Sequence, residues 1–164
     1  MSQYSGQEPM LPNSEPAVIR TNTKRRAFTG FGAVLLFVLA FVLFFHFSFT
    51  TVVVSGQSML PTLQNGKKVL VSKAYWLVGA IQDGNIVVLK GTTPGEYIIK
   101  RVYKMGGEAV DTFNAPSSFS LLDGQYKVPE GMIYVLGDNR SISEDSRRFG
   151  PIELRNVIGK VVAY

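Results

Sequence analysis

The chain has 164 residues, a formal net charge of +5, no cysteine and one histidine, His46. The lack of cysteine excludes disulfides, thiol nucleophiles and thiolate metal sites. With a single histidine, neither a Ser-His-Asp triad in a soluble domain nor a zinc site built on histidines is possible. Any hydrolytic chemistry must therefore use Ser, Thr, Lys, Tyr or carboxylate groups, and we expect no metal and no cofactor.

The positive charge is mild and dispersed. Residues 1–26 carry four basic and two acidic side chains, a net +2, and residues 50–164 carry thirteen and ten, a net +3. Nucleic-acid binding usually needs a basic stripe or patch, and none is visible. We therefore expect no nucleic-acid partner.

The N-terminal part divides into a tail and an anchor. Residues 1–23 are rich in Ser, Gln, Pro, Asn and Thr without an apolar period, and with the basic cluster 24–26 they form a predicted disordered cytoplasmic tail, 1–26. Residues 27–49 are uncharged, and 23 residues can cross a bilayer core of roughly 30 Å as a helix.

The uncharged segment is predicted to be a retained transmembrane anchor. A cleaved secretory signal has a shorter apolar core followed by a small-x-small site, which Phe47-Ser48-Phe49 fits poorly. The basic residues before it predict a cytoplasmic N-terminus and an extracytoplasmic domain, 50–164, on a single-pass protein of the cell membrane. His46 lies in the last turn, where an interfacial histidine is the simpler interpretation and a proton carrier the alternative.

Residues 50–164 are predicted to be all-β. Short β-branched or aromatic runs are separated by Gly, Pro, Asn and Asp clusters, and no long helical pattern follows the anchor. Six or more short strands in about 115 residues predict a compact antiparallel sheet or small barrel. The runs are 51–54, 68–71, 86–89, 97–103, 125–128, 132–136 and 157–162.

A further apolar stretch, Tyr75–Ile81, contains the only tryptophan of the chain, Trp76. It is either a core strand or a segment that rests in the headgroup layer of the membrane, where aromatic residues are frequent. The residue pattern leaves both interpretations open.

Two residues have the chemistry of a nucleophile and its base. Ser58 lies between Gly56 and Pro61, which define a tight bend that can present a side chain to a substrate. Lys100 lies in an apolar strand and shares a face with Ile98 and Val102. A lysine buried there is costly unless it is neutral or paired, and a neutral amine can take a proton from a serine hydroxyl. The plain alternatives are a turn serine and a lysine that reaches the surface.

Three segments in order resemble the bacterial type I signal peptidases, a serine–lysine peptidase family. Gly56–Leu63 matches the nucleophile segment Gly-x-Ser-Met-x-Pro-Thr-Leu, and Lys100–Val102 matches the base segment Lys-Arg-Val. Residues 137–150 match Gly-Asp-Asn-Arg-x-x-Ser-x-Asp-Ser-Arg-x-x-Gly at every fixed position. The resemblance covers about residues 24–164 and includes the single anchor of the short members.

The resemblance implies an all-β catalytic domain that cleaves signal peptides from secretory preproteins beside membrane lipid. It implies that Ser58 is the nucleophile, with its own N–H as oxyanion donor, and that Lys100 is the general base. The supporting residues that it implies are Ser143 to hold the lysine amine, Asp145 and Arg147 to brace the third segment, Asp138 near Arg101, and Met59 in the wall beside the nucleophile. Family substrates carry small residues at the first and third positions before the cut.

Some features depart from the family pattern or allow other functions. Gly56 stands where some members have a serine whose hydroxyl assists the oxyanion, which leaves a side-chain donor in doubt. The alternatives are an inactive or narrowly dedicated peptidase-like binding module at the membrane surface, and a membrane-anchored β scaffold with an exposed Lys100. Self-cleaving repressors also use a Ser-Lys pair, but the anchor excludes a DNA-bound repressor.

Overall fold

The computed structural model describes residues 23–91, 95–120, 122 and 124–164, and side chains from residue 30 onward. The chain forms two compact units, 1–39 and 40–164, which are treated separately. The predicted tail lies outside the described residues as far as residue 22.

One long helix, α1, spans Thr23–Ser48, so it begins four residues before the predicted anchor. Its part Gly30–Ser48 is 19 residues long and apolar enough to cross a membrane by length and composition. The helix is therefore consistent with an anchor.

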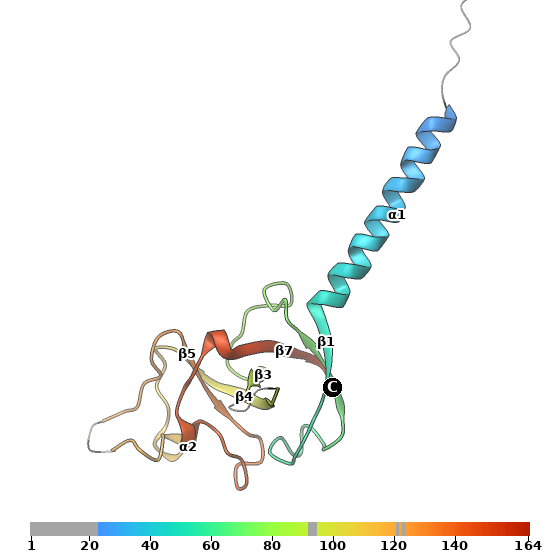
Figure 1. Ribbon diagram of the computed structural model, residues 1–164. Coiled ribbons are helices and arrows are strands. Elements are labelled where there is room, and N and C mark those ends of the chain that lie inside the picture. The colour runs from blue at the N-terminus through green and yellow to red at the C-terminus, as the bar shows by residue number, and fades with distance from the viewer. Residues whose placement is uncertain (1–22, 92–94, 121, 123) are drawn as a thin grey trace, which may run out of the picture. The chain divides into compact units, whose positions relative to one another are not determined.

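The rest of the described chain is built around a seven-stranded sheet, in which each neighbouring pair of strands is antiparallel (Figure 1). The strand order is β1-β2-β7-β3-β4-β5-β6. This confirms the predicted all-β fold behind one N-terminal helix. The strands are β1 (Phe49–Val53), β2 (Lys68–Ser72), β3 (Ile86–Lys90), β4 (Tyr97–Met105), β5 (Met132–Leu136), β6 (Ile152–Glu153) and β7 (Val157–Ala163).

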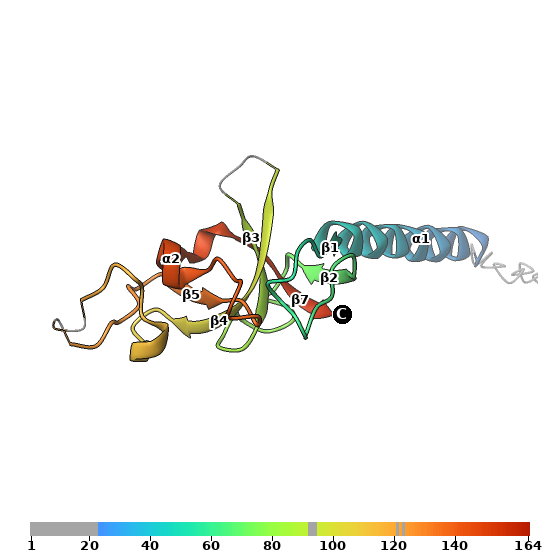
Figure 2. The ribbon, with the colours of Figure 1, turned by 90° about the horizontal axis from the view of Figure 1, so that it is seen from below.

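Short helical turns interrupt the loops: η1 (Thr112–Asn114), α2 (Ser146–Phe149) and η3 (Leu154–Asn156). The segment between β4 and β5 lies at the end of the sheet away from β1 and β2, as Figures 1 and 2 show.

Six of the seven predicted strands are present, and the one at 125–128 is not. That segment makes a single bridge, Ala109 with Lys127, because its backbone bonds to Gly107, Glu108 and Val110 extend over only a few residues. Val128 is nevertheless buried there. The two-residue strand β6 had no signal in the apolar pattern, since it is too short to alternate.

The core covers both faces of the central strands. Val88 of β3 packs with Met59 and Leu63 in one apolar cluster, while its neighbours Val87 and Leu89 pack in another. This follows from the alternation of side chains along a strand. The nucleophile segment is thereby part of the core, with Met59 and Leu63 as its anchors.

Tyr75–Ile81 is not a strand, so the core-strand interpretation is wrong. It belongs to the loop between β2 and β3, in which Ile81 is buried while Trp76 is 72% and Leu77 is 52% exposed. The apolar run does not alternate, and its loop geometry turns the two large side chains outward.

Candidate active site

The segment after β1 forms a compact turn that presents Ser58. Gly56 has φ +90°, a conformation that strains residues with a Cβ, and its N–H donates to the side-chain oxygen of Asn65 at 3.0 Å. The N–H of Leu63 donates to the carbonyl of Met59 at 2.9 Å, and Met59 is only 2% exposed. The buried Met59 and Leu63 therefore hold the turn while Ser58 remains accessible.

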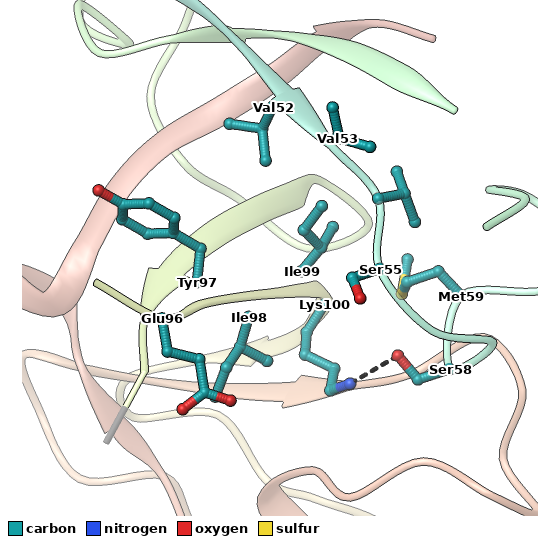
Figure 3. A pocket seen from close by; sticks show the side chains of 11 residues that line it. Val52, Val53, Ser55, Ser58, Met59, Glu96, Tyr97, Ile98, Ile99 and Lys100 are labelled. Carbon is teal, nitrogen blue, oxygen red and sulfur yellow. Dashed lines mark hydrogen bonds between the residues drawn. The ribbon is translucent and has the colours of Figure 1, made fainter. Parts of the chain in front are cut away.

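Lys100 of β4 meets this turn. Its Nζ lies 2.8 Å from the Oγ of Ser58, and the residue is only 4% exposed (Figure 3). Burial lowers the pKa of the Lys100 amine below its ordinary value, although the charges of Asp145 and Glu144 oppose this. The result is an amine biased toward its neutral form and in contact with a hydroxyl.

The third segment closes over the pair through backbone contacts. The N–H of Asn139 donates to the carbonyl of Ser58 at 2.9 Å. A Cβ added to Gly137 would lie 2.6 Å from that same carbonyl oxygen and would also collide with the side chain of Ser143. Only a residue without a side chain allows this approach, which explains the glycine.

Ser143 is brought to the same place. It is 7% exposed, and its Oγ makes no hydrogen bond of good geometry among the described residues, although it lies close enough to the Asp145 carboxylate to help lower the pKa of that group. Burying an unsatisfied hydroxyl is costly, so such a group in a site needs an explanation. Its packing against Gly137, which in turn contacts Ser58, puts it in the immediate surroundings of the pair.

Asp145 organises the segment from its fully buried position. It accepts from the N–H of Gly137 at 3.0 Å and from the guanidinium of Arg147 at 2.9 Å, and Arg147 also donates to the carbonyl of Arg140 at 2.8 Å. Burial opposes the charge of Asp145, but the bonds from Arg147 and Gly137 outweigh it and lower the pKa of the carboxyl. The charged Asp145 therefore braces the segment without touching Ser58 or Lys100.

Asp138 and Arg101 form a second brace. The guanidinium of Arg101 donates to both carboxylate oxygens of Asp138, at 2.8 and 2.7 Å, and to the carbonyl of Gly84 at 2.8 Å. Burial opposes the Asp138 charge, yet the bonds from Arg101 lower the pKa of its carboxyl. This bidentate pair ties the third segment to the residue next to Lys100.

A cleft of about 420 Å³ opens beside Ser58 and Lys100 (Figure 3). Its walls are Val52–Ser55 on one side and Glu96–Ile99 on the other, with Met59 beside the serine. The sequence analysis did not single out Ser55, Glu96 or Tyr97. The available signal was their position, since Ser55 directly precedes the first matched segment and Tyr97 and Glu96 lie three and four residues before Lys100.

Two strand edges face this cleft. β1 pairs with β2 alone, and Tyr97–Lys100 of β4 pairs with β3 alone, whereas β5 joins β4 only from Arg101 onward. Within the described parts of the chain, both edges therefore lack a second strand partner. An extended peptide can add to such an edge through backbone hydrogen bonds.

No group of three or more His, Asp or Glu side chains that could hold a metal ion occurs among the described residues. The polar side-chain groups that line the cleft are the Lys100 amine, the Glu96 carboxylate and three hydroxyls, those of Ser55, Ser58 and Tyr97. This set suits proton transfer between side chains.

Comparison with known proteins identifies relatives over almost the whole chain. The model of the family "signal peptidase, peptidase S26" matches residues 27–116 and 111–164. "Signal peptidase I" of Bacillus amyloliquefaciens is 31% identical over 93% of this chain and 91% of its own length. "Signal peptidase I T" of Bacillus subtilis is 33% identical over 77% of this chain and 79% of its own.

A solved structure of a signal peptidase I from Enterococcus faecalis is 24% identical and covers 51% of this chain and 98% of its own. Its TM-score of 0.39 is too low to add support to the fold described above.

We expect Gly137→Ala to destabilise the protein by about 1–3 kcal/mol, because the added methyl group overpacks the contact with Ser143 and the Ser58 carbonyl. Thermal unfolding in detergent measures this. Gly32→Ala is the control, since a Cβ there meets nothing within 4 Å. An unfolding temperature that is the same for both variants would contradict the close approach.

Proposed function

We propose, from the premise that this chain belongs to the signal peptidase family (peptidase S26) of serine-type peptidases, that it is a membrane-bound enzyme that removes N-terminal signal peptides from exported preproteins. The observation that carries this proposal is the contact of 2.8 Å between the buried Lys100 amine and the Ser58 hydroxyl, at the side of a cleft with two unpaired strand edges. The relatives named above carry this activity in their names.

In the first half of the reaction, Ser58 is the nucleophile and Lys100 the general base. The neutral amine takes the hydroxyl proton while the oxygen attacks the carbonyl carbon of the substrate. When the tetrahedral intermediate collapses, the lysine gives this proton to the leaving amine, and the peptide bond breaks. The signal peptide remains as an ester on Ser58. The buried position of Lys100 supports this role, because desolvation favours the neutral base at the start.

In the second half, the neutral Lys100 amine takes a proton from a water molecule, whose oxygen attacks the ester carbonyl. The bond to the Ser58 oxygen then breaks, Lys100 returns the proton to that oxygen, and the signal peptide leaves with a free carboxyl group. In both halves, negative charge develops on the carbonyl oxygen of the substrate, and hydrogen-bond donors are needed to stabilise it. Among the described residues none accepts a bond from the N–H of Ser58, which leaves that group for the oxyanion. The oxyanion therefore has one backbone donor, the N–H of Ser58, even though Gly56 offers no side-chain hydroxyl.

The other site residues position this pair. Ser143, with its unsatisfied Oγ, is the partner that orients the lysine amine when the substrate is bound. Asp145 with Arg147 and Asp138 with Arg101 hold the third segment against the nucleophile, and Met59 forms the wall next to it. These roles require that the two ion pairs stay formed while the enzyme turns over.

The substrate is an extended peptide that lies between β1 and the first half of β4. Backbone groups of both strands bind it without regard to sequence, and the apolar walls set which side chains fit. The valine, isoleucine and methionine side chains that line the cleft leave room for small residues at the first and third positions before the cut.

The helix α1 holds the enzyme in the cell membrane. The basic residues 24–26 precede the apolar span, so the N-terminus is cytoplasmic and the domain that follows lies outside. A scaffold with an exposed Lys100 is disfavoured by the 4% exposure of that residue. An inactive or narrowly dedicated binding module remains the competing function that the following test addresses.

The deciding experiment is cleavage of a preprotein with an alanine-rich export signal by the full-length protein in detergent. We expect wild type to cut at the signal boundary, and Ser58→Ala and Lys100→Ala each to lose more than about a thousandfold in kcat, since members of such a pair act as a unit. Mass spectrometry of the products locates the cut. Failure of folded wild type on several preproteins would favour a binding module, and cleavage by Ser58→Ala would overturn the site assignment.

The activity should depend on pH through Lys100. Because the neutral amine is the active form, kcat/KM should rise with pH and level off above the pKa of Lys100, which burial lowers from the ordinary 10.5. The negative charge of Glu144 raises this pKa, so Glu144→Gln should move the rising limb to lower pH with an unchanged plateau. A limb that stays in place in Glu144→Gln would exclude Lys100 as its source.

The cleft walls predict a limit on substrate size. Replacing alanine by phenylalanine at the first or third position before the cut should reduce kcat/KM by at least about tenfold, whereas the same change at the second position should have little effect because its side chain points out of the cleft. Competition between matched peptides, followed by mass spectrometry, measures the ratios. Equal loss at all three positions would contradict binding as an extended strand.

A further inference from the structure

Glu96 supplies the only carboxylate among the described residues that line the cleft beside Ser58 and Lys100. Its side chain is exposed, and no salt bridge joins it to another described residue. The reaction steps derived above give this carboxylate no task. An exposed carboxylate at the rim of a binding cleft can exchange its hydrating water for a cation that the substrate brings.

The stem of the Glu96 side chain is held against Gly91, which faces it across the turn between β3 and β4. The N–H of Gly91 donates to the carbonyl of Glu96 at 2.8 Å. A Cβ added to Gly91 would lie 2.9 Å from both the Cβ and the Cγ of Glu96. Because only glycine leaves room for these two carbons, the side chain of Glu96 has a defined starting direction.

The side chains of β4 divide between two faces at the cleft (Figure 3). Tyr97 and Ile99 point toward the valine side chains of β1. Glu96, Ile98 and Lys100 point the other way, as the alternation along an extended strand requires. The Glu96 carboxylate therefore lies on the face on which the Lys100 amine meets the serine hydroxyl.

The basic residues nearest to Glu96 in the chain are directed elsewhere. Lys90 is the register partner of Tyr97, so its side chain lies with that of Tyr97 on the opposite face. The Cα of Lys100 is four residues further along the strand, about 13 Å away at 3.3 Å per residue. The pKa of Lys100 is raised by two carboxylates of the third segment, which lie closer to the amine than this rim position.

The strand order sets the direction in which a signal peptide enters the cleft. β1 and β4 run in the same direction, because four antiparallel pairings link them in the order β1-β2-β7-β3-β4. β1 starts directly after Ser48, the last residue of α1. With α1 as the membrane anchor, the starts of both strands point back toward the bilayer. The apolar part of a signal peptide precedes its cut, so the residues before the cut lie beside these strand starts and run parallel to both.

This parallel alignment places the fourth residue before the cut beside Glu96. Residues that lie side by side on neighbouring strands direct their side chains to the same face. The first residue before the cut shares the apolar wall with Ile99, the residue of that face next to Lys100. Counting back along an extended chain sets the third residue beside Tyr97 and the fourth beside Glu96. The fourth side chain thus points away from the apolar wall, where a long side chain has room.

We propose that Glu96 binds a lysine or arginine side chain at the fourth position before the cut and so selects preproteins with a basic residue there. The inference rests on the proposed function and adds a charge preference to the size limit set by the apolar walls. An ion pair at the exposed rim is screened by solvent, so its effect on selection is modest. Because it forms away from the reacting atoms, it acts on peptide binding and leaves the chemical step unchanged.

The first test compares peptides that carry lysine, alanine or glutamate at the fourth position before the cut and are otherwise identical. Full-length protein in detergent cleaves them in competition, and mass spectrometry gives the ratios of kcat/KM. We expect wild type to prefer lysine to glutamate about fivefold at low salt, the size typical of exposed charge pairs, and less than about twofold in 1 M salt. Separate kinetics should place the difference in KM, with kcat unchanged.

Two substitutions and a matched control assign this preference to Glu96. Glu96→Gln should bring the ratio of lysine to glutamate close to one, and Glu96→Lys should reverse it. Glu130→Lys makes the same change of charge at another exposed carboxylate, which lies just before β5 and outside the cleft, and should keep the wild-type ratio. A wild-type ratio that persists in Glu96→Lys would overturn the proposal, and so would a wild type without any preference.

Peptide register and enzyme activity have separate controls. Lysine at the second position before the cut, or at the fourth position after it, should give no preference that depends on Glu96; such a preference at either place would overturn the assigned register. Fluorescence anisotropy of labelled peptides with Ser58→Ala reports binding without cleavage. Failure of wild type to cleave the alanine peptide would refute the proposed function, whereas equal affinities of Ser58→Ala for the lysine and glutamate peptides would refute the role of Glu96.

Discussion

The withdrawal of one lysine amine from water is the constraint on which the proposed catalysis depends. In water the Lys100 amine would be protonated and could not accept a proton from Ser58. Burial of Lys100 lowers the pKa of its amine, at a cost in folding free energy that the apolar clusters on both faces of the sheet offset. The partly exposed Ser58 therefore meets a proposed base, Lys100, that is shielded from solvent, and the cleft opens beside both.

The third segment converts this burial into a defined geometry. It contacts Ser58, the proposed nucleophile, through the backbone, by the bond from Asn139 to the Ser58 carbonyl and by the side-chain-free surface of Gly137. Its own conformation depends on Asp145, which accepts from both Gly137 and Arg147. The ion pair of Asp145 and Arg147 therefore does not touch the proposed reacting atoms, and it acts by fixing the backbone that positions Ser58.

Much of this arrangement could be predicted from the sequence, because strands of β-branched residues and the turns between them are local signals. The prediction was wrong at 125–128, where Val128 is buried but the backbone pairs too briefly to make a strand. The cleft walls at Glu96 and Tyr97 were missed because a free strand edge depends on where β5 stops pairing with β4, which no local pattern encodes. The residue pattern left open whether Trp76 lies in the core or on the surface, because the loop that exposes it is fixed by bonds of Lys73 and Lys160 to residues far away in the sequence.

If peptides bind as proposed, the two strand edges beside Ser58 that lack a partner among the described residues have a consequence for what the enzyme selects. The sheet is one strand short between β1 and the first half of β4, and a substrate completes it only when its own backbone is extended. A segment that is helical in the membrane must unwind over the residues that enter, and each residue so released gives up its helical hydrogen bond. Selection then depends first on backbone conformation, because a sequence that stays helical up to the cut cannot bind as an extended strand, whatever its side chains. Helix-breaking residues a few positions before the cut favour the extended conformation and so favour cleavage.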